Sequence, residues 1–261
     1  MSFRDKVYIV TGSSQGIGLE LGRQLHGKGA GVVFNGRRKA AALSGKVLPL
    51  SHNRCLYVPA DVSSFTECEA LVNKTVEKFG RIDGLILNAG ISAYGEFSEL
   101  SEEVVRQMVE VNMLGITWIT QLAIPYLRAS KGCILFISSI ASLHGVPRYS
   151  YYSAVKAAMN ALAESLRIEM KKDGVYVGTA LVGFTENEEQ KKTLNSRGEL
   201  EPVPSRSGFR PMPRVQLAEK LLDQLDRQRT IRVYSFMGKL GYFLSRISPK
   251  VYELLLKRNY R

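Results

Sequence analysis

The amino-acid sequence predicts an α/β fold: a doubly wound parallel sheet in a single domain, with helices on both faces. Two observations carry this prediction. Short apolar runs without polar alternation, typical of strands buried on both faces, take turns with longer segments whose apolar residues recur at helical spacing. The 261 residues are 45% hydrophobic and 9% aromatic, which is enough for one sizeable core and excludes intrinsic disorder.

Strands are expected where short runs of aliphatic and aromatic residues stand between turn residues. The first run ends in Thr11-Gly12 and the fourth in Asn88-Ala89-Gly90, so small and polar residues follow these strands directly. The expected strands are 7–10, 31–34, 56–58, 84–87, 133–137, 175–181 and 231–234.

Helices are expected between the strands. Ile17, Leu21 and Leu25 recur every four residues, and Ser63 or Ser64 can cap the next helix, which stops near Gly80. Further helices are expected over 101–127, 150–172 and 215–225. Strands joined by such helices are typical of βαβ units, and no repeat or low-complexity linker divides residues 1–235, which we expect to form one catalytic domain.

The turn after the first strand is rich in glycine. Glycines let backbone N–H groups approach a dinucleotide pyrophosphate, and the N-terminus of the next helix adds partial positive charge. A flexible turn is the alternative, but the position between first strand and first helix favours cofactor binding. The residues expected to contact the cofactor here are Thr11, Gly12, Ser14, Gly16, Ile17 and Gly18.

Three ordered motifs, Thr11-Gly12-x3-Gly16-x-Gly18, Asn88-Ala89-Gly90 and Tyr152-x3-Lys156, resemble the short-chain dehydrogenase/reductase family over about residues 5 to 235. The resemblance implies a Rossmann-like fold, a nicotinamide cofactor and a homodimer or homotetramer. It also implies a catalytic set of Asn112, Ser139, Tyr152 and Lys156. A fainter likeness to 3-keto-sphinganine reductases and related lipid-modifying members names no substrate.

Tyr152 and Lys156 are four residues apart on an expected helix and therefore share one face. A free tyrosine has a pKa near ~10, and a neighbouring ammonium lowers it, so this pair predicts an acid/base that works near neutrality. Ser139 ends the fifth strand and can stabilise charge on a substrate oxygen. His144, between Ser139 and Tyr152, is expected to line the loop or pocket.

Two of these residues have roles that only the resemblance implies. Lys156 is implied to hold the cofactor ribose as well, and Asn112 to hold a proton-relay water near Lys156. For Asn112 the alternative is a polar side chain that bonds backbone at a bend in the helix.

The end of the second strand reads Asn35-Gly36-Arg37-Arg38-Lys39, with Gly36 where NAD-type members of the family carry Asp. A guanidinium can form two charge-assisted hydrogen bonds with a phosphate. The missing acid and the cations favour NADP(H), with Arg37 on the 2′-phosphate and Arg38 and Ser14 assisting. A solvated basic helix start is the alternative.

Further cofactor contacts are expected after other strands. The resemblance assigns Asp61 and the Val62 amide to the adenine, although Asp61 can also cap the next helix. The small Asn88-Ala89-Gly90 segment lets the chain pass close to the cofactor, and Asn88 can tie neighbouring loops. After the sixth strand Val182 stands where the family usually has proline. We expect Gly183 and Thr185 to contact the nicotinamide amide, with Asn187 as the alternative to Thr185.

Residues 187–213 are polar and irregular in pattern and are expected to form a substrate lid. Phe184, Phe209 and Met212 can either line the substrate or pack the lid down.

Residues 236–261 are expected to form a basic amphipathic C-terminal extension, with six Lys/Arg and one Glu, a net +5 of the chain's +12. Apolar residues recur with helical period from Phe236 to Ile247, and Pro249 breaks the pattern before it resumes. Such a segment suits peripheral contact with an anionic membrane, which would hint at a lipophilic substrate. Packing on its own domain or on a neighbouring subunit is the alternative.

Three cysteines, Cys55, Cys68 and Cys133, lie far apart, which excludes a disulfide scaffold and indicates a reducing compartment. The chain enters a strand soon after Met1, so we expect no signal peptide, and no apolar run reaches the ~18 residues of a membrane span. The expected location is cytoplasmic, with the cytoplasmic membrane surface as a variant. No metal is expected, because the histidines and cysteines show no ligand spacing.

The sequence as a whole predicts an NADP(H)-dependent oxidoreductase that interconverts a ketone and a secondary alcohol, with reduction of a lipophilic carbonyl in the cell. A non-catalytic NADP(H)-binding sensor or scaffold is the alternative, and the presence of Ser139, Tyr152 and Lys156 argues against it. A nucleic-acid partner is not expected, because only the net charge favours one and no nucleic-acid-binding motif accompanies it.

Overall fold

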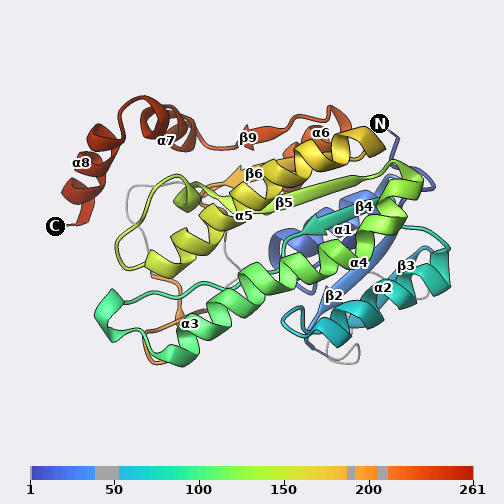
Figure 1. Ribbon diagram of the computed structural model, residues 1–261, viewed down its shortest axis with the longest axis horizontal. Helices are drawn as coiled ribbons and strands as arrows, with labels where there is room; N and C mark the ends of the chain where they lie inside the picture. The colour runs from blue at the N-terminus through green and yellow to red at the C-terminus, as the bar shows by residue number, and fades with distance from the viewer. Residues whose placement is uncertain (1, 39–52, 187–191, 205–210, 261) are drawn as a thin grey trace.

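The protein is described here by a computed structural model that covers residues 2–38, 53–186, 192–204 and 211–260. Its centre is a seven-stranded sheet with the order β3-β2-β1-β4-β5-β6-β9, in which every neighbouring pair is parallel (Figure 1). The strands are β1 (Val7–Val10), β2 (Gly31–Gly36), β3 (Cys55–Pro59), β4 (Gly84–Leu87), β5 (Cys133–Ser139), β6 (Tyr176–Val182) and β9 (Ile231–Val233).

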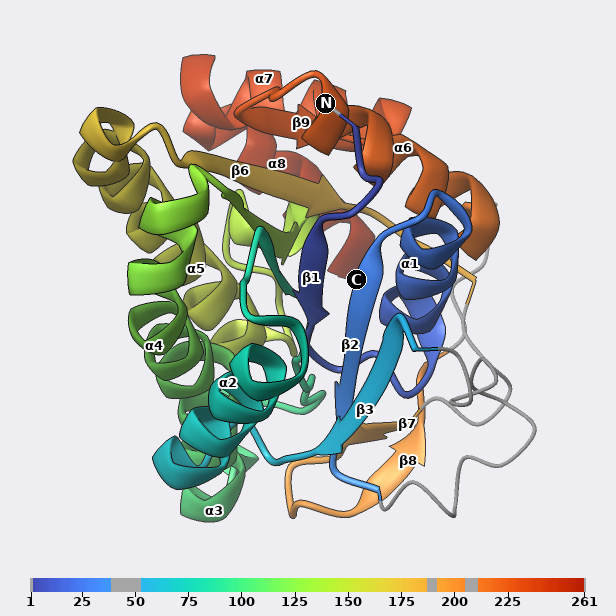
Figure 2. The ribbon, with the colours of Figure 1, turned by 90° about the vertical axis from the view of Figure 1, so that its right-hand side faces the viewer.

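Helices cover both faces of the sheet, as Figure 2 shows, and this confirms the predicted doubly wound fold. Successive strand residues point to opposite faces: Tyr8 and Val10 join one apolar core and Ile9 the other. The first core packs under α1 (Gly16–Gly27) and α6 (Arg214–Asp226). The second packs under α2 (Phe65–Phe79), α4 (Gly115–Ser130) and α5 (Ser150–Glu169).

The helix expected over 101–127 is interrupted in the structure. It consists of α3 (Glu102–Val109), one π-helical turn (Glu110–Leu114) and α4, and Ser101 caps its start by accepting a hydrogen bond from Val104 N at 3.3 Å. Apolar spacing cannot reveal such a turn, because one extra residue hardly shifts the period. Short 3-10 helices occupy Phe97–Glu99, Ile140–Ser142 and Met170–Asp173.

The described part of the stretch 187–213 is more regular than its sequence indicates. Within it β7 (Lys192–Leu194) and β8 (Leu200–Pro202) form an antiparallel pair, and buried Leu194 packs with Ala93 and Val104. The expectation of an irregular segment is therefore wrong for these residues, because burial of the Leu194 side chain holds the β7–β8 pair against the domain. Met212 is half-buried against the core. Asn187 and Phe209 lie outside the described residues.

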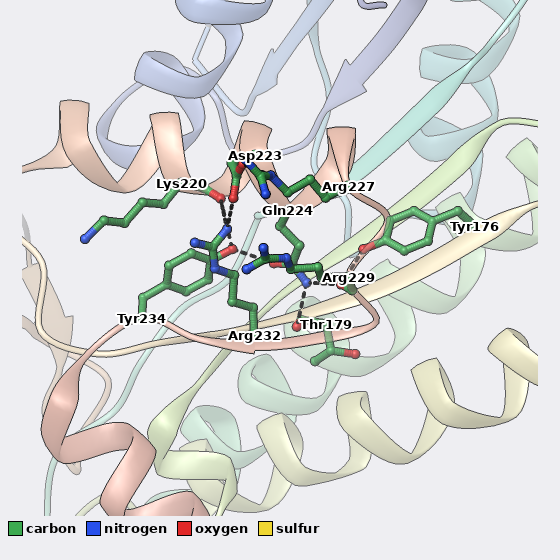
Figure 3. A network of polar contacts seen from close by, with 9 residues as sticks. All are labelled: Tyr176, Thr179, Lys220, Asp223, Gln224, Arg227, Arg229, Arg232 and Tyr234. Atoms are coloured by element: carbon green, nitrogen blue, oxygen red, sulfur yellow. Dashed lines mark hydrogen bonds and ion pairs between the residues drawn. The ribbon is translucent and has the colours of Figure 1, made fainter. Parts of the chain in front are cut away.

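A buried polar network joins α6 and β9 to β6 (Figure 3). The Gln224 side chain donates to the carbonyl oxygens of Thr179 and Arg229 at 3.0 and 2.8 Å and accepts from the Tyr234 hydroxyl. Tyr176 donates to the Arg229 carbonyl at 2.7 Å. The network fixes the chain immediately before the C-terminal helices.

The C-terminal extension folds as α7 (Phe236–Ile247) and α8 (Pro249–Tyr260), with the break at the predicted Pro249. Proline is well suited to the first turn of a helix, because the N–H groups there have no acceptor within the helix and a missing N–H costs nothing. Within the described residues, no helix has the length and apolar character needed to cross a membrane.

Candidate active site and cofactor cradle

The glycine-rich turn is held against the end of β4 by side chains. The Thr11 hydroxyl accepts hydrogen bonds from Asn88 N and Ala89 N, both at 3.0 Å. Asn88 Nδ2 in turn donates to the carbonyl oxygens of Thr11 and Gly12, both at 3.0 Å. The structure therefore brings two predicted motifs together, and it places Asn88 as the tie between loops that the sequence suggests.

Three glycines of this turn meet different requirements. Gly12 has a φ of +61°, and a Cβ there would lie 2.7 Å from Ala89 Cα. A Cβ on Gly18 would lie 2.4 Å from Asn88 Nδ2, so neither position has room for a side chain. Gly16, the first residue of α1, has a φ of +63°, and a Cβ there would meet no atom within 4 Å. The cradle thus opens at the helix N-terminus, where a pyrophosphate fits.

Asn35 is a structural part of the cradle that sequence reasoning assigned no role. Its side chain is buried, accepts a hydrogen bond from Gly12 N at 3.2 Å and donates to the Ala60 carbonyl at 3.0 Å. The sequence signal that could have found it is an asparagine near the end of an apolar strand, because a buried amide side chain there must form hydrogen bonds with nearby backbone groups. Asn35 thereby links the ends of β1, β2 and β3.

The end of β2 has no room for an acidic side chain. A Cβ on Gly36 would lie 2.7 Å from Ser14 Oγ and 3.1 Å from the Tyr57 hydroxyl. Tyr57 donates to the carbonyl oxygens of Gly36 and Arg38 at 3.1 and 2.7 Å and so fixes this turn. Arg38 donates to Gln15 Oε1 at 2.8 Å, and Arg37 is exposed beside it. Lys39 lies outside the described residues.

Asp61 is bonded within its own turn. Its Oδ1 accepts from Ser63 N at 3.0 Å and from the Ser63 hydroxyl at 2.7 Å, while Ser64 caps α2. Val62 is buried, and its carbonyl oxygen would lie 2.8 Å from a Cβ on Gly115. Ser64 and not Asp61 is therefore the cap of α2, so the expected capping role of Asp61 is wrong, and its carboxylate instead closes the turn before the helix.

Two of the four predicted catalytic residues, Asn112 and Lys156, lie beside Gly90, and a third, Tyr152, lies near Lys156. A Cβ on Gly90 would be 2.7 Å from Asn112 Oδ1 and 3.6 Å from Lys156 Nζ, so a glycine is needed for the loop to pass. Lys156 is buried, donates from Nζ to the Ile137 carbonyl at 3.0 Å, and holds Nζ 5.9 Å from the centre of the Tyr152 ring.

Asn112 sits on the π-helical turn, fully buried. Its amide donates to the carbonyl oxygens of Ile91 and Met108 at 3.1 and 3.0 Å, and its Oδ1 accepts from Ile91 N at 3.2 Å. This is the backbone-bonding arrangement that the sequence left open. It also turns the asparagine toward Gly90 and the lysine, since π-turns redirect single side chains.

Ser139 ends β5 as expected, and its hydroxyl accepts a hydrogen bond from Ala141 N at 3.1 Å. A hydroxyl that accepts one hydrogen bond can still donate another. Its neighbour Ser138 is buried and bonds the Lys156 carbonyl at 3.4 Å, so Ser138 ties the strand to α5.

Gly183 and Thr185 follow β6 at the same end of the sheet. A Cβ on Gly183 would lie 2.8 Å from Ser235 Oγ, so this glycine packs against the start of α7. The Thr185 hydroxyl lies 3.4 Å from the Gly183 carbonyl, and Thr185 pairs with Met212 across an isolated β-bridge. Among the described residues there is no cluster of three His, Cys, Asp or Glu that could hold a metal ion.

These features define a dinucleotide-binding α/β enzyme fold, and comparison with known proteins places it more closely. The family model described as short chain dehydrogenase matches residues 6–198, well over half of the chain. The chain therefore belongs to the short-chain dehydrogenase family, which confirms the resemblance drawn from the motifs.

Several curated proteins are similar to this chain. It is 35% identical over 199 residues to 11-beta-hydroxysteroid dehydrogenase A of Sesamum indicum, covering 74% of this chain and 56% of that protein. It is 38% identical to 11-beta-hydroxysteroid dehydrogenase-like 4A of Arabidopsis thaliana, covering 70% and 62%. L-fucose dehydrogenase of Mus musculus is 34% identical, covering 67% and 63%. The match thus spans less than two thirds of the length of these relatives.

Solved structures share the fold at low sequence identity. A short-chain dehydrogenase from Streptomyces avermitilis superposes with a TM-score of 0.82 at 22% identity, covering 98% of this chain and 97% of that one. A short chain dehydrogenase from Burkholderia cenocepacia J2315, in complex with NADP, gives 0.81 at 23% identity, covering 98% and 99%.

Proposed function

We propose that this protein is an NADP(H)-dependent oxidoreductase that interconverts a ketone and a secondary alcohol by hydride transfer. The observation that carries the proposal is the buried Lys156 ammonium, 5.9 Å from the Tyr152 ring centre and beside Asn112. A cation held close to a phenol favours the phenolate and so prepares it for proton transfer. Family membership supports the same reaction class.

The side chains divide the reaction between them. In reduction, the Tyr152 hydroxyl donates its proton to the carbonyl oxygen, while Ser139 donates a hydrogen bond that stabilises charge developing on that oxygen. Lys156 stabilises the resulting phenolate, and the region around Asn112 holds the water through which the proton is restored. A bound nicotinamide supplies or accepts the hydride at the substrate carbon.

The cradle residues hold the dinucleotide. Thr11, Gly12, Gly16, Ile17 and Gly18 shape the pyrophosphate site at the start of α1. Lys156 holds the nicotinamide ribose. The remaining contacts come from the strand ends, at Asp61, Val62, Asn88, Ala89, Gly90, Gly183 and Thr185.

The preference for NADP(H) rests on the end of β2. Ser14 fills the space that an acidic residue at position 36 would need, and the exposed Arg37 guanidinium stands next to it, with Arg38 held by Gln15. Arg37 forms charge-assisted hydrogen bonds to the 2′-phosphate, with Arg38 and Ser14 assisting. The solved neighbours, one named as a complex with NADP and one with NADH, support a nicotinamide cofactor in general.

Fluorescence titration with NADPH and NADH tests the cofactor. We expect tighter binding of NADPH, and a loss of about tenfold or more for NADPH alone in Arg37→Ala, since one charge-assisted contact is worth roughly 1.5–3 kcal/mol. Arg4→Ala, an exposed arginine next to β1, is the matched control. Preference for NADH would contradict the 2′-phosphate assignment, and binding of neither would contradict the function.

The substrate is a lipophilic carbonyl or its alcohol. Relatives named as 11-beta-hydroxysteroid dehydrogenases and a solved neighbour named as a 3-ketoacyl-(acyl-carrier-protein) reductase support this class. Residues 192–204 and 211–213, the described part of the stretch 187–213, form the lid over it. Turnover of NADPH with long-chain ketones, ketosteroids and ketoacyl compounds tests the class. NADPH binding without turnover of any carbonyl would favour the sensor or scaffold function instead.

The proposal includes a homodimer or homotetramer. Exposed apolar side chains on the outer helical face support it, namely Val109 and Leu114 around the π-turn and Ile168 on α5. Light scattering after size-exclusion chromatography measures the assembly, and a monomer at micromolar concentration would contradict it.

A further inference from the structure

The two C-terminal helices expose an unusual amount of apolar surface. Of the fifteen exposed large hydrophobic residues in the described part of the chain, eight lie on α7 and α8. Phe236 is 81% exposed and Ile247 66%. The others are Met237, Leu240, Phe243, Val251, Leu254 and Leu255. We call these eight residues the tail face.

The helix α7 is packed with its small residues inward. Gly238 and Gly241 are buried, and a Cβ on Gly238 would lie 2.8 Å from both Ile140 and Val233. A Cβ on Gly241 would lie 3.1 Å from the Tyr252 ring of α8. Phe236, Leu240 and Phe243 therefore point away from the domain that Gly238 contacts. A helix that used the domain as its only partner would bury its large apolar residues, so the tail face is built for a further apolar partner.

Positive charge surrounds the tail face. Lys239, Arg246, Lys250 and Lys257 are exposed on the same helices, and the single acidic residue, Glu253, is paired with Lys257 at 2.9 Å. A two-fold contact between copies of this chain would bring the same cations toward one another, which opposes self-association. Apolar surface within a basic rim instead matches a bilayer with anionic headgroups.

The tail helices also contact the loops around the candidate active site. Gly183, after β6, packs against Ser235 at the start of α7, and Ile140, directly after Ser139, packs against Gly238. On α8 the Tyr252 ring meets His144 edge to face with the ring centres 5.4 Å apart. Figure 1 shows α7 and α8 at the end of the molecule where the chain enters α5, the helix of Tyr152.

We propose that the tail face docks the protein on an anionic lipid bilayer and thereby presents the active-site loops to a ketone dissolved in that bilayer. The large apolar side chains enter the acyl boundary, and the cations contact the headgroups. The docking itself stands on the exposed residues alone. The delivery of substrate rests on the function proposed above.

Co-sedimentation of the full chain with vesicles tests the docking. The vesicles are made of phosphatidylcholine alone, or of phosphatidylcholine with about 30% phosphatidylserine as the anionic lipid. We expect binding to the anionic vesicles, at least tenfold weaker binding to the neutral ones, and a decline in binding as salt increases.

Paired variants locate the contact. Phe236→Glu/Phe243→Glu should lower the partition coefficient on anionic vesicles at least tenfold, and Lys239→Gln/Lys250→Gln should lower it by a similar factor. Phe65→Glu/Val215→Glu is the matched control, because both residues are exposed apolar positions outside the tail, and it should bind as wild type does. Circular dichroism and thermal melts establish that each variant is folded.

Two results would overturn the docking. One is that wild type and both tail variants bind anionic vesicles equally well, or that none of them binds. The other is a concentration-dependent dimer, seen by light scattering, that Phe236→Glu/Phe243→Glu abolishes without any vesicle binding by wild type, since the tail face is then a contact between copies. NADPH titration without vesicles separates this test from the proposed function: the tail variants should bind NADPH as wild type does.

Discussion

Ser14 and Gly36 face each other at the end of β2, where the proposed preference for NADP(H) can be tested. A Cβ on Gly36 would lie 2.8 Å from Ser14 Cβ, closer than ordinary van der Waals contact. Gly36→Asp alone should therefore weaken NADPH binding at least tenfold through charge repulsion without creating an NADH site. Gly36→Asp combined with Ser14→Gly removes the clash and should shift the preference toward NADH.

Titration of both variants with NADPH and NADH measures the shift, and Ser14→Gly alone is the control for loss of the hydroxyl. If Gly36→Asp binds NADH tightly without the second change, the steric argument is wrong.

In the proposed reaction, the chemical step depends most directly on Tyr152. Tyr152→Phe keeps the ring beside Lys156 but removes the transferable proton. Turnover of NADPH with a carbonyl substrate should fall by about 10²–10⁴-fold while NADPH affinity stays within twofold. Tyr151→Phe is a matched control, because the Tyr151 ring stacks on Phe97 at 5.9 Å and keeps this contact without its hydroxyl. Normal turnover of Tyr152→Phe would refute the assigned role.

At the residue scale, the motifs predicted which residues lie close together, but their detailed contacts depend on packing that the sequence does not show. The sequence predicted that Asn88 ties loops and that Asn112 lies near Lys156. It did not reveal that Gly90 must lack a side chain to pass Asn112 Oδ1. Nor did it reveal Asn35, because a buried amide is recognisable only from the backbone groups around it.

Among the elements, α6 and β9 depend on one buried side chain. Gln224 bridges the Thr179 and Arg229 carbonyls, and Tyr234 donates to its Oε1 (Figure 3). Tyr234→Phe leaves this buried acceptor without its donor and should lower the free energy of unfolding by about 1–3 kcal/mol. Urea unfolding measures the change. Tyr242→Phe, on α7, is the control and should change the free energy by less than about 0.5 kcal/mol.

The Arg232 guanidinium bonds Asp223 in the same network and holds the pKa of that carboxyl below its usual value. This ion pair is exposed to solvent on the Asp223 side. If Tyr234→Phe leaves the free energy of unfolding unchanged, the Arg232–Asp223 ion pair rather than the Gln224 hydrogen bonds holds α6 against β9.

Elements were predictable wherever local pattern matched tertiary packing. Long periodic segments and caps such as Ser64 defined α2 and α5 to within a few residues, and Pro249 marked the break before α8. The β7–β8 pair escaped prediction because three-residue strands have too few residues to show alternation, and their register depends on the distant contact of Leu194 with Ala93.

The whole molecule buries several phenols and thiols that are neutral at pH 7. Burial raises the pKa of the Cys68 and Cys133 thiols to about 12, and it raises the pKa values of Tyr8, Tyr176 and Tyr234 as well. In the unfolded chain these groups lose their protons from about pH 9 to 10 upward. Above that pH the unfolded state binds fewer protons than the folded one. The contribution of these groups to the free energy of unfolding is therefore complete below about pH 9 and is lost as the pH rises.

Tyr8→Phe tests this alkaline sensitivity with little structural change. The Tyr8 hydroxyl is buried beside the Cys133 thiol, which is a weak hydrogen-bonding group, so its removal should change the free energy of unfolding at pH 7 by less than about 1 kcal/mol. For each group that stays protonated in the folded state, the free energy of unfolding falls by about 1.4 kcal/mol per pH unit above the pKa of that group in the unfolded chain. Between pH 9 and 11 the free energy of unfolding should therefore fall by about 1 kcal/mol less in Tyr8→Phe than in wild type. Urea unfolding at each pH gives the comparison, with Tyr126→Phe, a half-buried tyrosine on α4, as the control. Parallel pH profiles for Tyr8→Phe and wild type would mean that the folded protein ionises Tyr8 as readily as the unfolded chain does.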